Sequence, residues 1–259
     1  MTHIVNIPKY PIVLCHGLFG FHQVGPFIYF RNIINPLKRV GVKVEATTVH
    51  PTDSIKNRSF QLYKQINSIM EQYNTDKVHI VAHSMGGLDS RYLISQFDQK
   101  KSVLSLTTLG TPHRGSYIAE WCNFNITERL RIEKILKTFG IPFRAIQELS
   151  PTYVREVLNE TILDSPNVFY SSYGAYTDEL FRFSPLTFFH KILLEKEGKN
   201  DGLVSLESAK WGQRFQVIPN CDHRDLINWS FYDATPIYFN IVNQLYCLEK
   251  ELELSNISF

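Results

Sequence analysis

The sequence predicts an α/β fold, in which a mostly parallel central sheet is flanked by helices. Two observations carry this prediction: short apolar runs typical of buried strands alternate with stretches of helical apolar spacing, and polar or glycine-rich segments directly follow several of the runs. A charged, helical stretch interrupts this alternation in the middle of the chain. We therefore predict a single domain, 1–259, with a helical cap insertion at about 117–166.

Each element follows from its local pattern. Apolar, β-branched runs predict strands, whereas Leu62, Ile66 and Ile69, and then Leu88 and Tyr92, recur at helical spacing. Strand–helix–strand units are parallel, and parallel sheets bind ligands beyond the carboxyl ends of their strands. The functional residues are therefore expected just after the first, third and fourth strands. The predicted strands are 12–15, 42–49, 78–82, 103–109, 167–173 and 215–218, and the predicted helices are 59–73, 85–97 and 235–248.

Composition excludes several classes of protein. The net charge is +2 and the Lys and Arg residues are scattered, so no nucleic-acid partner is predicted. The four cysteines are widely spaced and form no Cys-x-x-Cys pair, which argues against a metal or redox site and predicts reduced thiols. We predict no cofactor and no bound metal.

The amino-terminal segment has neither the basic start nor the long apolar run of a secretory signal. The longest apolar runs are shorter than the roughly 18 residues that indicate a membrane span. We therefore predict an intracellular, cytoplasmic protein. Peripheral contact with a membrane or lipid-droplet surface is left open.

The strongest local signal lies at Ser84, between the strand 78–82 and the helix 85–97. Ala82 and Gly86 flank it in a small-x-Ser-x-Gly pattern, where a tight strand-to-helix turn needs small residues two positions away on either side. Such a turn strains the serine backbone and exposes its Oγ at the edge of the sheet. The alternative is a serine that only caps the helix. The preceding strand and the following Gly86-Gly87 pair favour a nucleophile.

A serine nucleophile needs a base and an acid, which follow it in this chain order in folds of this kind. His223 lies in a loop after the strand 215–218 and is the predicted base, whereas His190 lies in an amphipathic stretch and is interpreted as a packing or surface residue. Asp201 is the predicted acid, although Asn-Asp-Gly is also a good turn sequence. Asp178 is the reserve acid, and Asp222 is too close to His223 in sequence.

Two backbone N–H groups should stabilise the oxyanion that such a nucleophile creates. Met85 directly follows the nucleophile and supplies one. Leu18 follows His16-Gly17 after the first strand and is predicted to supply the other.

The segments 10–18, 82–87, 110–116 and 200–205, together with His223 and Asp225, resemble the Pseudomonas/Burkholderia-type triacylglycerol lipases and their eukaryotic relatives, which have the α/β-hydrolase fold. The resemblance implies a triad of Ser84, Asp201 and His223, the oxyanion donors Leu18 and Met85, and a mobile lid over an acyl groove.

This chain departs from the family pattern at several points. Ala82 replaces a common Gly, and neither a signal peptide nor a disulfide is evident. The bacterial members hold calcium with two aspartates, of which Asp225 matches one, but no Asp stands near 183–185. We therefore assign no calcium site, and the alternative role of Asp225 is that of an acid just ahead of a short helix, 226–229.

The insertion at about 117–166 is either a lid or ordinary packing. Trp121 and Phe124 come early in the insertion. In the stretch that follows them, apolar residues recur at helical spacing and basic residues occupy much of the rest. The apolar members are Ile132, Ile135, Leu136 and Phe139, and the basic members are Arg129, Arg131, Lys134 and Lys137.

The sequence and the resemblance together predict a serine carboxylic-ester hydrolase that acts on lipids, namely a triacylglycerol lipase with a lipid ester as its substrate. Alternatives with the same triad are a lipid acyltransferase, a phospholipase and a short-chain esterase. A non-catalytic binding protein is the remaining class, because fold alone does not establish an activity.

Overall fold

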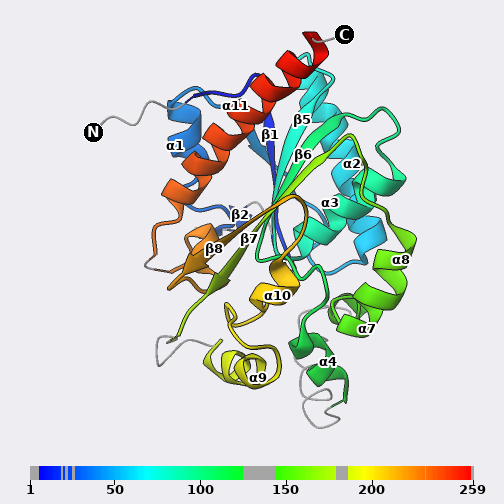
Figure 1. The fold of residues 1–259 in the computed structure, drawn as a ribbon, viewed down its shortest axis with the longest axis vertical. Helices are drawn as coiled ribbons and strands as arrows, with labels where there is room; N and C mark the ends of the chain where they lie inside the picture. The colour runs from blue at the N-terminus through cyan, green and yellow to red at the C-terminus, as the bar shows by residue number, and fades with distance from the viewer. Residues whose placement is uncertain are drawn as a thin grey trace.

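The computed structural model of the protein describes residues 6–18, 20, 23–24, 27–124, 144–178, 186–230 and 232–257. Within these residues the core is a six-stranded sheet in the order β4-β1-β5-β6-β7-β8, and every neighbouring pair is parallel (Figure 1). The predicted α/β fold is confirmed. The strands are β1 Ile12–Cys15, β4 Val44–Ala46, β5 Val78–His83, β6 Val103–Leu109, β7 Phe169–Tyr176 and β8 Arg214–Pro219.

Helices cover both faces of the sheet because successive strand residues point to opposite sides. In β1, Ile12 and Leu14 pack into a cluster with α1 (Ile34–Arg39) and α11 (Thr235–Ile257), whereas Val13 and Cys15 pack against the other two helices. Those two are α2 (Ile55–Gln72) and α3 (Met85–Gln96), which lie on the opposite side of the sheet in Figure 1. The strands are therefore apolar on both faces, as the continuous apolar runs indicated.

Two of the predicted helices extend beyond their predicted ranges, α2 at its start and α11 at its end, for identifiable reasons. α2 begins at Ile55, where Ser54 caps it by accepting a hydrogen bond from the Asn57 N–H at 3.3 Å. α11 continues past residue 248 because Glu249 is anchored: its carboxylate accepts the N–H groups of Lys9 and Tyr10 at 2.7 and 3.0 Å. Contacts with the opposite end of the chain thus lengthen this helix.

Some short elements carried no sequence prediction. They are α1, the hairpin of β2 (Gln23–Val24) and β3 (Phe27–Ile28), and α10 (Leu206–Ala209). None spans more than six residues, which is too short for apolar periodicity to reveal.

The predicted cap region contains several helices beyond the carboxyl ends of the strands (Figure 1). α4 (Tyr117–Phe124) packs on α9 (Thr187–Glu197), with Ile118, Cys122 and Leu193 in one cluster, although α9 lies outside the predicted insertion. Residues 125–143, which include the predicted apolar and basic helix, lie outside the described residues. The cap and its motion therefore stay predictions. The other helices of the predicted insertion are α6 Arg144–Gln147, α7 Pro151–Tyr153, the π-helix η1 Val154–Leu158 and α8 Asn159–Thr161.

Among the described helices, none combines the length and the apolar character needed to cross a membrane.

Candidate active site

Ser84 occupies the sharp turn between β5 and α3. Its backbone has φ 56° and ψ −133°, a conformation that is costly for a residue with a side chain and that clusters at functional sites. The turn is tight: a Cβ on Gly86 would lie 2.7 Å from the His16 carbonyl oxygen, so only glycine fits there. Ala82 is fully buried between β1 and β6. The strand–turn–helix geometry predicted for Ser84 is therefore present.

Asp201 and His223 meet although 22 positions separate them in the sequence. The His223 Nδ1 lies 2.7 Å from the Asp201 Oδ2, and the His223 N–H donates to the Asp201 carbonyl at 2.9 Å. The other carboxylate oxygen of Asp201 accepts the N–H groups of Leu203 at 2.9 Å and Val204 at 2.7 Å. The Asn-Asp-Gly turn thus holds a buried carboxylate rigidly against the imidazole, so the turn and the acid interpretations are compatible.

The alternative residues lie elsewhere. Asp178 is exposed. The carboxylate of Asp222 pairs with the guanidinium of Arg224 at 2.8 Å. His190 is buried in α9, where its Nε2 lies 2.9 Å from the Thr177 carbonyl oxygen, so it is a packing residue.

Ser84 and His223 line a common cavity of about 410 Å³. Its wall is predominantly apolar, which is typical of sites that bind apolar ligands. Gly110, at φ 57°, lies behind the acid–base pair, where a Cβ would come within 3.1 Å of both Asp201 and His223. The remaining residues of the wall are Leu18, Tyr29, His83, Pro112, Ser116, Ile118, Ala119, Cys122, Ile146, Leu149, Phe189, Leu203, Val204, Arg224, Ile227 and Trp229.

The two predicted oxyanion donors flank Ser84. Met85 is the first residue of α3, where the backbone N–H has no acceptor within the helix. Leu18 lines the cavity and follows Gly17, which packs so closely that a Cβ on it would lie 2.7 Å from the Ser84 Cβ. The arrangement can place two N–H groups at an oxyanion on a ligand bound to Ser84.

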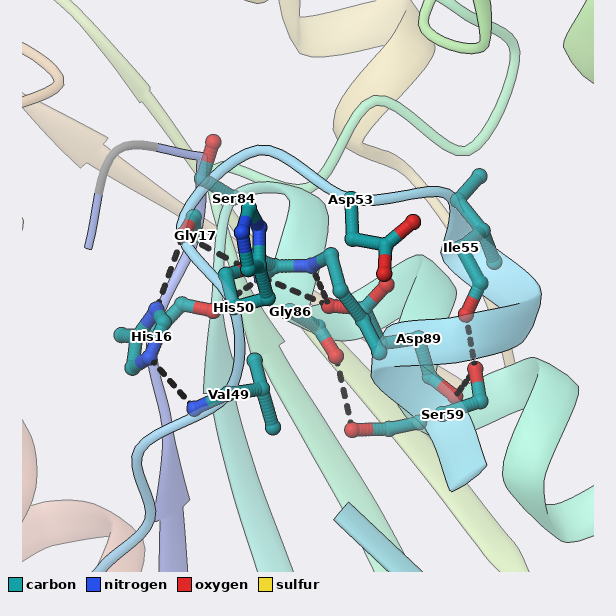
Figure 2. Close-up of polar contacts among 12 residues, drawn as sticks. His16, Gly17, Val49, His50, Asp53, Ile55, Ser59, Ser84, Gly86 and Asp89 are labelled. Carbon is teal, nitrogen blue, oxygen red and sulfur yellow. Dashed lines mark hydrogen bonds and ion pairs between the residues drawn. The ribbon is translucent and has the colours of Figure 1, made fainter. Parts of the chain in front are cut away.

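A buried arginine supports the loop that carries Leu18. Figure 2 shows His16 and Gly17 of this loop together with Asp89 of α3. Arg58 of α2 is fully buried and forms an ion pair with Asp89 of α3 at 2.7 Å. Its Nη2 donates to the carbonyl oxygens of His16 at 3.0 Å and Gly17 at 3.2 Å. Burial raises the pKa of Asp89 to about 6, and the adjacent guanidinium opposes that shift.

The sequence analysis overlooked Arg58, although a signal exists. Arg58 stands four positions before Leu62 and eight before Ile66, so it lies on the apolar face of α2. A charged residue at such a position indicates a buried, paired group.

We expect Arg58→Met to destabilise the protein by about 3–5 kcal/mol, because it leaves the buried Asp89 carboxylate without its partner. Urea unfolding measures the change. Lys38→Met is the matched control, since it breaks the exposed Lys38–Glu45 ion pair and should cost less than about 1 kcal/mol. Equal costs for the two variants would contradict the expectation.

Asp225 is held within the protein. Its carboxylate accepts the N–H of Asp222 at 2.7 Å and the hydroxyl of Ser230, and it begins the short 3₁₀ helix η2, Asp225–Ile227. Burial raises the pKa of Asp225. In the part of the chain that the structure describes, no cluster of three or more His, Cys, Asp or Glu side chains could hold a metal ion.

Comparison with known proteins places this chain in a family. Residues 11–165 match the family described as "Palmitoyl protein thioesterase". Triacylglycerol lipase 2 of Saccharomyces cerevisiae is 30% identical over 272 aligned positions, which cover 86% of this chain and 81% of that protein. The triacylglycerol lipase of Vibrio cholerae is 38% identical over 112 positions, which cover 43% of this chain and 35% of that protein.

Among solved structures, the mature BlEst2 lipase of Bacillus licheniformis shares the fold at a TM-score of 0.75 and 22% identity, with 94% of this chain and 96% of that chain covered. The family match extends over more than half of the chain, and the similarity to the yeast lipase extends over most of both proteins. The chain therefore belongs to the α/β-hydrolase family of serine ester hydrolases that contains the Pseudomonas/Burkholderia-type triacylglycerol lipases and their eukaryotic relatives.

Proposed function

We propose that this protein is a lipase that hydrolyses carboxylic esters of fatty acids, with triacylglycerol as its substrate. The observation that carries the proposal is the strained Ser84, which shares an apolar cavity with His223, itself bonded to the buried Asp201. The names of the yeast and bacterial relatives support a triacylglycerol substrate.

In the proposed reaction His223 removes the proton from the Ser84 hydroxyl while the Ser84 oxygen attacks the ester carbonyl. Asp201 fixes the tautomer of His223 and stabilises the imidazolium that forms. The N–H groups of Leu18 and Met85 stabilise the tetrahedral oxyanion. The carbon–oxygen bond to the alcohol then breaks, and the departing alcohol takes the proton from His223.

Water completes the cycle. His223 removes a proton from the water molecule, whose oxygen attacks the acyl-enzyme carbonyl. The bond to the Ser84 oxygen breaks, Ser84 recovers its proton and a fatty acid leaves. Water enters and a fatty acid departs, so atoms and charges balance.

The cavity supports a long apolar acyl group. Its apolar wall includes Ile118 and Ala119 of α4 and Phe189 of α9, the two helices that cover the carboxyl edge of the sheet. We propose that these helices belong to a cap that covers the acyl chain. When a fatty acyl chain binds there, the apolar surface that it buries stabilises the complex by about 25 cal/mol per Å².

The acyl preference can be measured with p-nitrophenyl esters of increasing chain length. We expect kcat/KM to rise from acetate to medium and long chains, by up to about tenfold for every two methylene groups that the cavity buries. Activity confined to short chains would exclude a lipase and favour a small-ester hydrolase.

Two variations of this assay test an acyltransferase and a thioesterase. Faster turnover in the presence of an acceptor alcohol, with transfer products, would identify an acyltransferase. Preferential hydrolysis of the matching acyl thioesters would identify a thioesterase, which the match to the palmitoyl thioesterase family favours as the second candidate.

We further propose that the protein works in the cytoplasm and contacts lipid surfaces peripherally. Phe188 of α9 is 56% exposed and packs edge-on against Trp121 of α4, with ring centroids 5.5 Å apart, which supports an apolar contact surface near the cavity. None of the four cysteines is joined to another in a disulfide, which suits a reducing compartment. Fractionation of cells that express the protein tests this location directly.

A further inference from the structure

Two buried side chains connect the segments of the active site. The Gly17 N–H donates to the Tyr29 hydroxyl oxygen at 2.9 Å, and that hydroxyl lies 2.8 Å from the Nδ1 of His83. The Nε2 of His83 lies 3.0 Å from the His223 carbonyl oxygen. The loop before Leu18, the turn at Ser84 and the loop of His223 are therefore joined through Tyr29 and His83.

The direction of each hydrogen bond follows from the two outermost groups, since the Gly17 N–H can only donate and the His223 carbonyl can only accept. Tyr29 accepts from Gly17, so its only hydrogen can be donated to the Nδ1 of His83. His83 Nδ1 must then be unprotonated, and its proton resides on Nε2. That proton is donated to the His223 carbonyl, which can only accept. When His83 is neutral, each donor in this series of three hydrogen bonds therefore has an acceptor.

The surroundings of His83 favour this neutral form. Burial lowers the pKa of His83 well below its ordinary value, and the nearby His223 and His16 lower it further. Burial also raises the pKa of Tyr29, so the hydroxyl keeps the proton that it donates. The His83 and His223 rings lie 4.5 Å apart between centroids, so a charged His83 would oppose the imidazolium that His223 becomes.

The peptide groups around Gly17 need such support because glycine leaves the chain conformationally free. Arg58 holds the His16 carbonyl at 3.0 Å while Tyr29 holds the Gly17 N–H, so the peptide between His16 and Gly17 is fixed at both ends. The Gly17 carbonyl accepts from Arg58 at 3.2 Å and from the Gly20 N–H at 3.2 Å, and the Nδ1 of His16 lies 2.9 Å from it. In a trans peptide the N–H of Leu18 points opposite to that carbonyl, so its direction is set by the same contacts.

We propose that Tyr29, oriented by His83, is a positioning residue that holds the Gly17–Leu18 loop so that the Leu18 N–H meets the oxyanion. This inference rests on the proposed function, since it assumes that Ser84 attacks an ester. Tyr29 acts through the Gly17 peptide. Its hydroxyl therefore contributes to the transition state, where the oxyanion exists, more than to substrate binding.

The test compares kcat and KM of the wild type and of Tyr29→Phe with a p-nitrophenyl ester. Removal of one oxyanion donor costs about 10²–10³ in kcat, so loss of its support should cost about 10–100-fold while KM changes less than about twofold. Tyr170→Phe is the matched control. Tyr170 is as deeply buried as Tyr29, and its hydroxyl also accepts a backbone N–H, that of Ser165 at 2.9 Å, but it lies outside the cavity wall. Its kcat should stay within about twofold of wild type.

His83→Gln breaks the same contact from the other side. A glutamine amide can still donate to the His223 carbonyl, but it offers no acceptor at the position of Nδ1 to the Tyr29 hydroxyl. Adding Tyr29→Phe to His83→Gln should lower kcat by less than about threefold more, because the two changes remove one shared interaction. Independent, multiplicative losses would overturn the link between the two residues.

Other outcomes also decide the inference. A raised KM at unchanged kcat would make Tyr29 a wall of the acyl cavity. An unfolding temperature of Tyr29→Phe far below that of Tyr170→Phe, with the kcat loss abolished on cooling, would make it a structural residue. Either result overturns the proposal and leaves the proposed function intact. If Ser84→Ala instead kept the kcat of the wild type, the proposed function would be overturned, and this inference with it.

Discussion

Ser84→Ala is expected to lower kcat by about 10⁶-fold, the scale seen when the nucleophile of a Ser-His-Asp hydrolase is removed. Alanine has no oxygen with which to form the acyl-enzyme, so any remaining turnover comes from water and the oxyanion donors alone. The fold should persist, because the replacement removes only the hydroxyl of the half-buried Ser84 and keeps the Cβ that packs near Gly17.

Hydrolysis of a p-nitrophenyl ester and covalent labelling by a fluorophosphonate both measure this loss. Ser116 is the matched control, since among the described residues it is the second serine that lines the cavity, and its hydroxyl donates to the Leu203 carbonyl at 2.6 Å. Ser116→Ala should keep its label, whereas Ser84→Ala should lose it. Labelling of Ser84→Ala at the wild-type rate would show that another residue is the nucleophile.

Asp201→Asn is expected to lower kcat by about 10⁴-fold, because it places the wrong tautomer of His223 in the site. One oxygen of Asp201 accepts the N–H groups of Leu203 and Val204, and an asparagine oxygen would remain there. Its NH₂ group would then face the His223 Nδ1 and donate to it. His223 would have to carry its proton on Nε2, where it cannot accept the proton of Ser84.

The measurement compares kcat of Asp201→Asn with that of Asp178→Asn at fixed pH. Asp178 is exposed, and its substitution should change kcat by no more than about twofold. A loss confined to Asp178→Asn would reverse the assignment of the acid. Circular dichroism shows whether each variant keeps its secondary structure. It therefore distinguishes a loss of kcat caused by the wrong His223 tautomer from one caused by unfolding.

Local restrictions explain why part of the site could be predicted. The strained turn at Ser84 needs small residues at fixed distances, and both Ala82 and Gly86 stand at those positions. The parallel sheet then requires that Ser84 and the loops carrying Asp201 and His223 share one edge. The bond between Asp201 and His223 therefore agrees with the prediction, while the catalytic roles await the two variants above.

The sequence by itself determined the alternation of strands and helices, the turn at Ser84 and the order of the three site residues, because each depends on neighbouring residues or on general rules of chain topology. Only the tertiary structure decided the burial of Arg58 against Asp89, the joining of α9 to α4, and the contact of His83 with His223, which are 140 positions apart. Such contacts depend on how separate elements pack, and no local pattern specifies them. The Arg58–Asp89 and His83–His223 contacts arise because buried polar groups need partners, and the contact of α9 with α4 arises because their apolar side chains pack together away from water.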